Sequence, residues 1–270
     1  MRPITRATFT IINVIPNPLY SLNRLAWDSV HFGFPVAELT PDKLPVRVLL
    51  RALQRARHEG FHLVYWKALP EQEVSDRLLN QWSGMLVDRR VTFKTDLSLA
   101  APVRSQTGQA TFKVTVFPKE APTQDLLSLA MAAGQLSRFR RDPSISAGSF
   151  RELYETWVRR STLRELADLV LVISDCGDRH IGMVTLILRQ PNAQIGLIAV
   201  EESFRGMGLG SLLMQAARER MTLAGAASAT VVTQLDNVGA CKLYERHGYT
   251  SAEVRHWYHF WPLAVTQPAN

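Results

Sequence analysis

The alternation of apolar and polar residues divides the chain into two structured segments. The best boundary lies at residues 101–110, where Pro, Gly, Ser and Thr occur without any apolar period. Such a stretch is typical of a linker. We therefore predict a smaller N-terminal domain over residues 1–100 and a C-terminal domain over residues 111–270.

The C-terminal segment shows both of the periods that distinguish strands from helices. Strand-like runs occupy residues 111–117, 169–174, 181–188, 193–200, 229–234 and 253–261. Helical spacing occupies residues 124–136, 150–163, 209–223 and 238–247. Turn residues at 175–178 are expected to join two of the strands into a hairpin. This order indicates an α/β domain with a mixed sheet.

The N-terminal segment also alternates between the two periods. Helices are predicted at residues 41–57 and 72–82, and strands at residues 61–66, 85–88 and 91–97. The pattern indicates a small α/β unit, and by itself it points to no activity.

Composition narrows the class of protein. The 270 residues are 46% hydrophobic, which is enough for one large core or two modest ones. No apolar run approaches the roughly 18–20 residues of a membrane span, and no signal peptide is apparent at the N-terminus. Cys176 and Cys241 lack metal-ligand spacing, and two thiols in so long a chain favour a reducing compartment. We expect a cytoplasmic protein without membrane insertion.

The net charge of +7 has three explanations: a nucleic-acid partner, phosphate-bearing small molecules, or an ordinary surface with extra arginine. Lys and Arg are spread along the chain without a block of five, and no nucleic-acid-binding motif occurs. We therefore expect no nucleic-acid partner. The oligomeric state is left open, and a homodimer is compatible with the sequence.

A glycine-rich loop at residues 205–210 lies between a predicted strand and a predicted helix. Its glycines allow backbone N–H groups to approach a ligand closely, and the helix N-terminus behind them favours a pyrophosphate. The loop lacks the Lys-Ser/Thr of a P-loop and the G-x-G-x-x-G spacing of a dinucleotide site. A glycine-rich turn without a ligand is the alternative.

The loop, Arg-Gly-Met-Gly-Leu-Gly, resembles the Arg/Gln-x-x-Gly-x-Gly/Ala loop of the GNAT family of N-acetyltransferases. The resemblance covers residues 111–261 and implies a GNAT fold, in which helices flank a mixed, splayed central sheet. It also implies that acetyl-CoA binds along the loop and the strand before it, without a metal. The residues that this assigns to acetyl-CoA are Leu197, Ile198, Ala199, Val200, Arg205, Gly206, Met207, Gly208, Leu209, Gly210 and Ser211.

The helix at 238–247 carries a second match to the same family, N-x-x-A-x-x-L-Y-x-x-x-G-Y over residues 237–249. The resemblance implies that Asn237 contacts the acetyl-CoA arm and that Tyr244 reaches the thioester sulfur. A phenol there could protonate the departing thiolate. The alternative for Tyr244 is a core aromatic on an amphipathic helix.

The cysteine and histidine side chains of the C-terminal segment have explanations other than catalysis or metal binding. Cys241 lies one turn before Tyr244, but His247 is on a different helix face, so we interpret Cys241 as a packing residue. His256 and His259 face opposite sides of one predicted strand, which does not suit two ligands of one metal.

Two further stretches, at residues 27–37 and 137–143, resemble segments of the nucleotide-sugar acetyltransferases within the GNAT family. The resemblance implies that the acceptor is an amino-dideoxy sugar linked to a nucleotide such as dTDP. It assigns Trp27, Phe32, Phe34, Arg138 and Phe139 to substrate binding, with Arg138 pairing with the pyrophosphate. The alternatives are an aromatic plug of the N-terminal core and a solvated helix end.

Asp88, at the end of a predicted strand, is our candidate for the base that accepts the amine proton, and a surface turn acid is its alternative. Two rival functions remain. One is a GNAT enzyme acting on an amine of a protein, polyamine or antibiotic, and the other is a non-catalytic module that binds coenzyme A or RNA. Tyr244 argues against the non-catalytic module.

Overall fold

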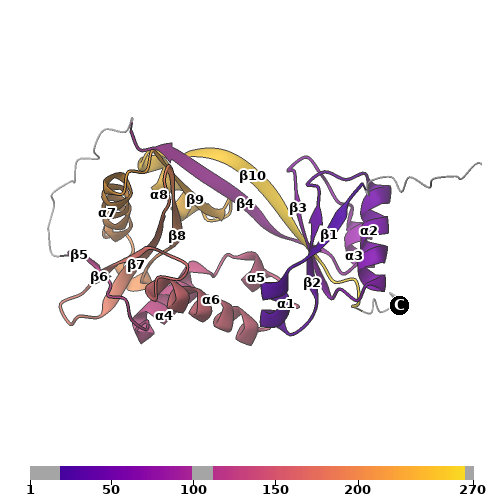
Figure 1. The fold of residues 1–270 in the computed structure, drawn as a ribbon, viewed down its shortest axis with the longest axis horizontal. Helices are drawn as coiled ribbons and strands as arrows, with labels where there is room; N and C mark the ends of the chain where they lie inside the picture. Colours follow the sequence, from indigo (N-terminus) through magenta and orange to yellow (C-terminus); the bar gives the residue numbers. More distant parts are fainter. Residues whose placement is uncertain (1–18, 99–111, 265–270) are drawn as a thin grey trace, which may run out of the picture.

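The computed structural model describes residues 19–98 and 112–264, so the predicted linker lies outside the described residues. All described strands belong to one sheet, in the order β1-β2-β3-β10-β4-β9-β8-β7-β6-β5 (Figure 1). Strands β2 and β3 are parallel, as are β8 and β9, and the other neighbours are antiparallel. The predicted mixed α/β sheet is confirmed.

The strands of this sheet are β1 (Ser21–Arg24), β2 (Val36–Thr40), β3 (Leu63–Ala68), β4 (Met85–Asp96), β5 (Val114–Val116), β6 (Leu169–Ser174), β7 (His180–Leu188), β8 (Asn192–Val200), β9 (Ser228–Gln234) and β10 (Thr250–Phe260). The helices are α1 (Ala26–Phe32), α2 (Val46–His58), α3 (Asp76–Gln81), α4 (Gln124–Ala133), α5 (Arg138–Arg141), α6 (Ala147–Thr162), α7 (Leu209–Leu223) and α8 (Val238–Arg246), with a short 3₁₀ turn at Glu202–Phe204.

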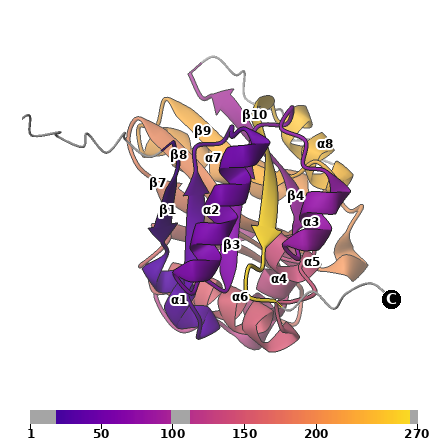
Figure 2. The same cartoon turned by 90° about the vertical axis from the view of Figure 1, so that its right-hand side faces the viewer.

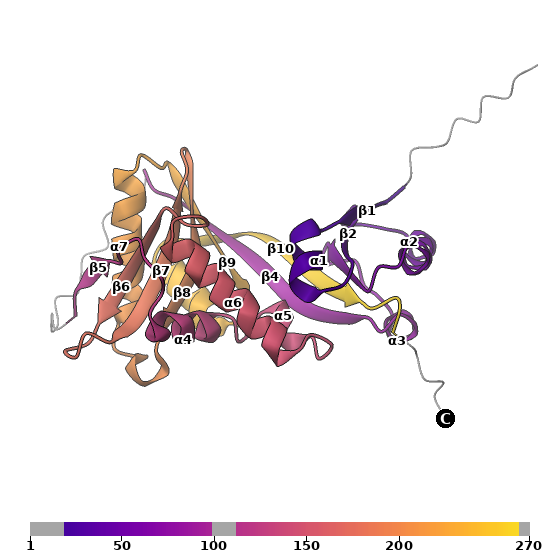
Figure 3. The same ribbon diagram turned by 60° about the horizontal axis from the view of Figure 1, so that its bottom comes forward.

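Strands β4 and β10 connect the two halves of the sheet. The long diagonal pair runs from the α7–α8 end to the α2–α3 end of the molecule (Figures 1 and 3). On one side β10 pairs with β3, and on the other β4 pairs with β9. The last strand in the sequence therefore completes the N-terminal part of the sheet.

Helices cover both faces of this sheet. In the N-terminal part, α2 and α3 lie over one face (Figure 2). Trp66, Leu53 and Phe260 belong to the core of this part and are fully buried. In the C-terminal part, α4 and α6 pack on one face of β6–β8 and α7 packs on the other. Within the described residues, no helix is both long and apolar enough to cross a membrane.

The structure differs from the predictions for the N-terminal segment in two respects. The strands expected at 85–88 and 91–97 form one strand, β4, because its ladders to β9 and β10 run past Arg89 and Arg90 without a turn. Asp88 therefore lies within a strand and not at its end. Strands β1 and β2 and helix α1 were not predicted, because the aromatic stretch around residues 27–37 has no clean period.

Candidate active site

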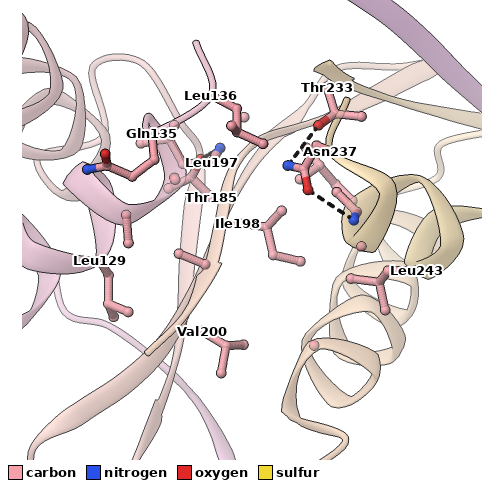
Figure 4. Close-up of a pocket in the computed structure, with 18 of the residues that line it drawn as sticks. Leu129, Gln135, Leu136, Thr185, Leu197, Ile198, Val200, Thr233, Asn237 and Leu243 are labelled. Carbon is pink, nitrogen blue, oxygen red and sulfur yellow. Dashed lines mark hydrogen bonds between the residues drawn. The ribbon is translucent and has the colours of Figure 1, made fainter. Parts of the chain in front are cut away.

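A cavity of about 1550 Å³ opens where β8 and β9 separate. The parallel ladder joins only Asn192 to Ile195 of β8 with Ser228 to Val231 of β9. Beyond it, residues 196–200 and 232–234 line opposite walls of the cavity, as the side chains of Ile198, Thr233 and Asn237 show (Figure 4). Backbone edges that diverge in this way are left available to an extended ligand.

The glycine-rich loop forms one end of the cavity. Gly206 and Gly208 both have φ of +82°, and a Cβ added to either would meet no atom within 4 Å, so open space lies in front of them. Gly208 is the N-cap of α7 and offers no side chain to the free N–H groups of the first turn. The loop therefore presents an uncapped helix N-terminus, which favours an anion.

Most of the residues assigned to acetyl-CoA line this cavity. They are Leu197, Ile198, Ala199, Val200, Arg205, Gly206, Gly208, Leu209, Gly210, Ser211 and Asn237. Met207 is the exception, because it does not line the cavity and its side chain is 58% exposed. Arg205 donates from Nε to the carbonyl of Val200 at 3.3 Å, which ties the loop to the end of β8.

Strand β8 bulges beside the cavity. Its register against β7 shifts between Val184 and Leu186, and the N–H of Leu197 donates to Thr185 Oγ1 at 2.7 Å. Gly196 makes this contact possible, since a Cβ there would stand 2.7 Å from the same hydroxyl oxygen. The N–H of Leu197 is therefore already occupied.

Asn237 is held at the N-terminus of α8. Its Oδ1 accepts from the N–H of Ala240 at 3.2 Å, and its Nδ2 donates to Thr233 Oγ1 at 3.3 Å (Figure 4). Asn237 thus serves as an ordinary N-cap and lines the cavity at the same time.

Tyr244 is at once a core aromatic and a cavity residue. Its side chain is 2% exposed, and its ring lies 5.7 Å from that of Phe93 and 6.2 Å from that of Tyr249. Burial raises the pKa of the Tyr244 hydroxyl, with smaller contributions from Tyr249 and Cys241. The group therefore carries its proton throughout the neutral range.

Asp88 faces the same cavity and is 4% exposed, so it is not a surface turn acid. Its Oδ2 accepts from Gln234 Nε2 at 3.4 Å, whereas its Oδ1 has no hydrogen-bond partner among the described residues. Burial raises the pKa of Asp88 to about 6, although the Gln234 hydrogen bond and Arg90 oppose the shift. A carboxylate with this pKa can accept a proton near neutral pH.

Arg138 lies in an aromatic cage and is not a solvated helix end. Its guanidinium carbon is 4.0 Å from the ring centroid of Trp257, 4.2 Å from that of Tyr65 and 4.4 Å from that of Phe139. Burial lowers its pKa, and its buried Nη1 has no hydrogen-bond partner in the described part of the chain. A buried guanidinium with an unused donor is suited to an anionic ligand.

A second cavity, of 260 Å³, lies beside Arg138 and is lined also by Trp27 and Phe139. The structure thus brings three of the five residues assigned to substrate to the two cavities. Phe32 and Phe34 line neither of them and pack against each other at 5.8 Å, beside the core. For these two residues the position fits an aromatic plug.

Reasoning from the sequence missed Trp257 and Arg90, which also line the large cavity. No local motif marks either residue, because Trp257 belongs to the last strand and reaches the site only through sheet pairing. The guanidinium carbon of Arg90 lies 5.6 Å from the ring centroid of Trp257, on the cavity side of β4.

His259 is fully buried, and its Nδ1 lies 2.6 Å from Asp142 Oδ2. Within residues 19–98 and 112–264, no three or more His, Cys, Asp or Glu residues are grouped to hold a metal ion. Cys241 is half-buried, and its thiol donates to the carbonyl of Gln234 at 3.6 Å, as a packing residue would.

Residues 136–249 match the model of the acetyltransferase (GNAT) family. The chain is 28% identical over 145 residues to the spore coat polysaccharide biosynthesis protein SpsD of Bacillus subtilis; the match covers 54% of this chain and 50% of SpsD. It is 30% identical over 105 residues to N-alpha-acetyltransferase 30 of Schizosaccharomyces pombe, covering 36% of this chain and 68% of that protein. This chain thus spans half the length of SpsD.

Among solved structures, the fold is similar to that of a GCN5-related N-acetyltransferase from Sphaerobacter thermophilus. The TM-score is 0.57 at 14% identity, over 92% of this chain and 79% of that one. At such low identity the likeness concerns the fold alone. It extends over both halves of the chain, including the strands that precede the glycine-rich loop.

Proposed function

The chain belongs to the GNAT family of acetyltransferases, and we propose that it acetylates the 4-amino group of a nucleotide-linked amino-dideoxy sugar. Enzymes of this family use acetyl-CoA as the acyl donor.

The separation of β8 and β9 is the observation that supports acyl transfer best. An extended pantetheine arm needs a slot bordered by free backbone edges, and its pyrophosphate needs N–H donors at one end. The diverging strands provide the slot beyond Ile195, and Gly206 and Gly208 open the N-terminus of α7 at its end. The residues present therefore fit acetyl-CoA, and the cavity residues named above are those proposed to hold it.

The proton transfers are assigned to two residues of the cavity. Asp88 accepts the proton that the amine loses as its nitrogen bonds to the acetyl carbon. Tyr244 gives its proton to the sulfur as the C–S bond breaks. The N–H of Leu197 cannot stabilise the developing oxyanion, because Thr185 occupies it. In this proposal, another hydrogen-bond donor in the cavity wall stabilises the oxyanion.

Three features support a nucleotide-sugar acceptor. Arg138 holds an unused buried donor at the amine end of the cavity, where a substrate phosphate would complete it. The segments at 27–37 and 137–143 resemble those of the dTDP-fucosamine acetyltransferase of enterobacterial common antigen synthesis. SpsD, by its name, belongs to polysaccharide biosynthesis. In this proposal the N-terminal domain covers the sugar nucleotide through Trp27, which lines the smaller cavity.

A protein N-terminus is the second candidate acceptor, because the S. pombe relative is named as an N-alpha-acetyltransferase. The discriminating experiment offers acetyl-CoA with dTDP-linked 4-amino sugars, their 4-hydroxy counterparts and peptides with free N-termini, and follows thiol release. We expect release only with the 4-amino sugar nucleotides. Turnover with the peptides alone would overturn the sugar assignment.

A further inference from the structure

The 260 Å³ cavity has a composition that the acyl-transfer reaction does not explain. It lies among helices α1, α5 and α6, which meet on the sheet face opposite α2 (Figure 3). Its lining includes two arginines, Arg138 and Arg160, and two tryptophans, Trp27 and Trp157. Cations beside aromatic faces are the chemistry that binds a phosphorylated base.

We infer that this cavity binds the nucleoside diphosphate of the acceptor, with the arginines toward the phosphates and the tryptophans on a thymine or uracil base. The inference rests on the proposed function and specifies where the nucleotide of that acceptor binds. It adds Trp157, Arg160 and Asp28 to the substrate-binding residues.

The two cavities are adjacent, so one substrate can reach both. Arg138, Phe139 and Trp157 line each of them. Asp88 lines the large cavity but not the small one, and the proposed function places the reacting amine beside it. A sugar at Asp88 therefore places its diphosphate beside Arg138, and the nucleoside continues toward Trp157.

The tryptophan rings are exposed but held in position. Trp27 is 45% exposed and stacks on His31 at 5.1 Å, while His31 Nε2 is 3.0 Å from the carbonyl oxygen of Ser149. Trp157 is 40% exposed, with its ring 5.6 Å from that of Tyr154. Rings fixed in this way lose little conformational entropy when a base stacks on them.

Arg160 and Arg138 both have guanidinium N–H groups that make no hydrogen bond to a described residue. Arg160 uses its Nε for Glu165, at 2.9 Å, and no other hydrogen bond of its guanidinium occurs among the described residues. Arg138 has the unpartnered Nη1 described above. Phosphate oxygens would therefore pair with donors that have no hydrogen-bond partner among the described residues.

Asp28 is the residue that we expect to distinguish thymine and uracil from cytosine. Its Oδ1 accepts from the Tyr65 hydroxyl at 3.2 Å, and its Oδ2 accepts no hydrogen bond from the described residues. Thymine and uracil carry an N–H at ring position 3, which a carboxylate can accept, whereas cytosine has a lone pair there. We therefore expect the cavity to favour dTDP or UDP over CDP.

Acetyl-CoA also contains an adenosine diphosphate, so the experiment must separate the two nucleotides. The probe is dTDP, titrated calorimetrically into the full chain, alone and with saturating coenzyme A. We expect dTDP to bind in both cases and CDP to bind at least tenfold more weakly. Competition between dTDP and coenzyme A would overturn the inference, because the nucleotide would then occupy the glycine-rich loop.

Matched variants locate the site. Trp157→Ala and Arg160→Ala should each weaken dTDP binding at least tenfold. The controls are Arg159→Ala, on the same helix as both test residues, and Val30→Ala, on α1; both positions are exposed and outside both cavities, and dTDP binding should stay within twofold. Equal effects of test and control variants would overturn the inference, as would unchanged binding in folded Trp157→Ala and Arg160→Ala proteins.

The outcome also separates this inference from the proposed function. Binding of dTDP that depends on Trp157 and Arg160 supports the cavity assignment even if no amino sugar is acetylated, and only the proposed acceptor would then fail. Acetylation of a dTDP sugar with unchanged kinetics in both variants would retain the proposed function and overturn the cavity assignment.

Discussion

Asp88 on β4 lies directly opposite Trp257 on β10, and each presents a buried polar atom that has no hydrogen-bond partner within residues 19–98 and 112–264. The atoms are Asp88 Oδ1 and Trp257 Nε1, and both residues line the large cavity. Side chains opposite each other in an antiparallel ladder share one face of the sheet. An acceptor and a donor are thus left unsatisfied on neighbouring strands, and such groups are costly unless a ligand completes them.

The raised pKa of Asp88 predicts how activity depends on pH. If Asp88 is the base, kcat/KM should fall below about pH 6, where its carboxyl takes a proton. Asp88→Asn should lower kcat about 10²–10⁴-fold at pH 7.5, and the ratio of wild type to variant should shrink toward pH 5. The amine's own protonation affects both proteins equally, so the ratio isolates Asp88. A ratio that is constant between pH 5 and 8 would exclude Asp88 as the base.

The same pKa predicts an opposite effect on stability. The folded-state pKa of about 6 lies above the ordinary 3.8, so folding favours protonated Asp88. The resulting stabilisation is complete below about pH 4 and is lost as the pH rises through 6. Asp88→Asn should therefore raise Tm at pH 7.5, and the accompanying gain in unfolding free energy should be at most about 3 kcal/mol. At pH 4 the substitution should leave Tm nearly unchanged. Calorimetry at the two pH values tests this, and a lower Tm at pH 7.5 would contradict it.

The sequence predicted elements best where a local rule governs them. The helix from Leu209 to Leu223 agrees with the structure at both ends, because a glycine begins it and its apolar period is regular. The hairpin of β6 and β7 is also confirmed, since turn residues lie between two apolar runs. Residues of the loop, the end of β8 and Tyr244 line one cavity.

The parts that escaped prediction depend on long-range pairing. Arg89 and Arg90 interrupt the apolar pattern of β4. The strand is nevertheless continuous, because it pairs with β10 on one side and β9 on the other. Trp257 joins the site only because β10 inserts between β3 and β4, which no local signal reveals. The aromatic stretch was assigned as a unit, but only Trp27 of its three assigned aromatics lines a cavity.

Gly208→Val should abolish the rise in Tm that acetyl-CoA produces. A side chain there would project into the open space before the α7 N-terminus, and φ of +82° disfavours any β-branched residue. Gly60→Val is the matched control, because Gly60 has φ of +77° and equal free space outside both cavities. Both variants should lose stability, and only Gly208→Val should lose the acetyl-CoA shift. If both retain it, the loop is not the pyrophosphate site.

Tyr244→Phe gives the sharpest test of the chemistry. The ring fills the same space and no hydrogen bond of the hydroxyl to a described residue is lost, so stability and acetyl-CoA affinity should remain close to wild type. If the hydroxyl protonates the leaving sulfur, kcat should fall about 10²–10⁴-fold. Because burial raises the Tyr244 pKa, the wild-type kcat profile should show no alkaline limb from this group below about pH 10.

Tyr249→Phe supplies the control for that measurement. Tyr249 is equally buried, its ring lies 6.2 Å from that of Tyr244, and it does not line the cavity. Its hydroxyl has no hydrogen-bond partner among the residues that the structure describes. A purely structural role for buried phenols predicts equal kinetic effects of the two substitutions, whereas proton donation predicts a loss confined to Tyr244→Phe. Single-turnover rates on the best acceptor make chemistry the measured step. A loss below about threefold in Tyr244→Phe, far short of the range for general acid catalysis, would mean that the sulfur takes its proton from water.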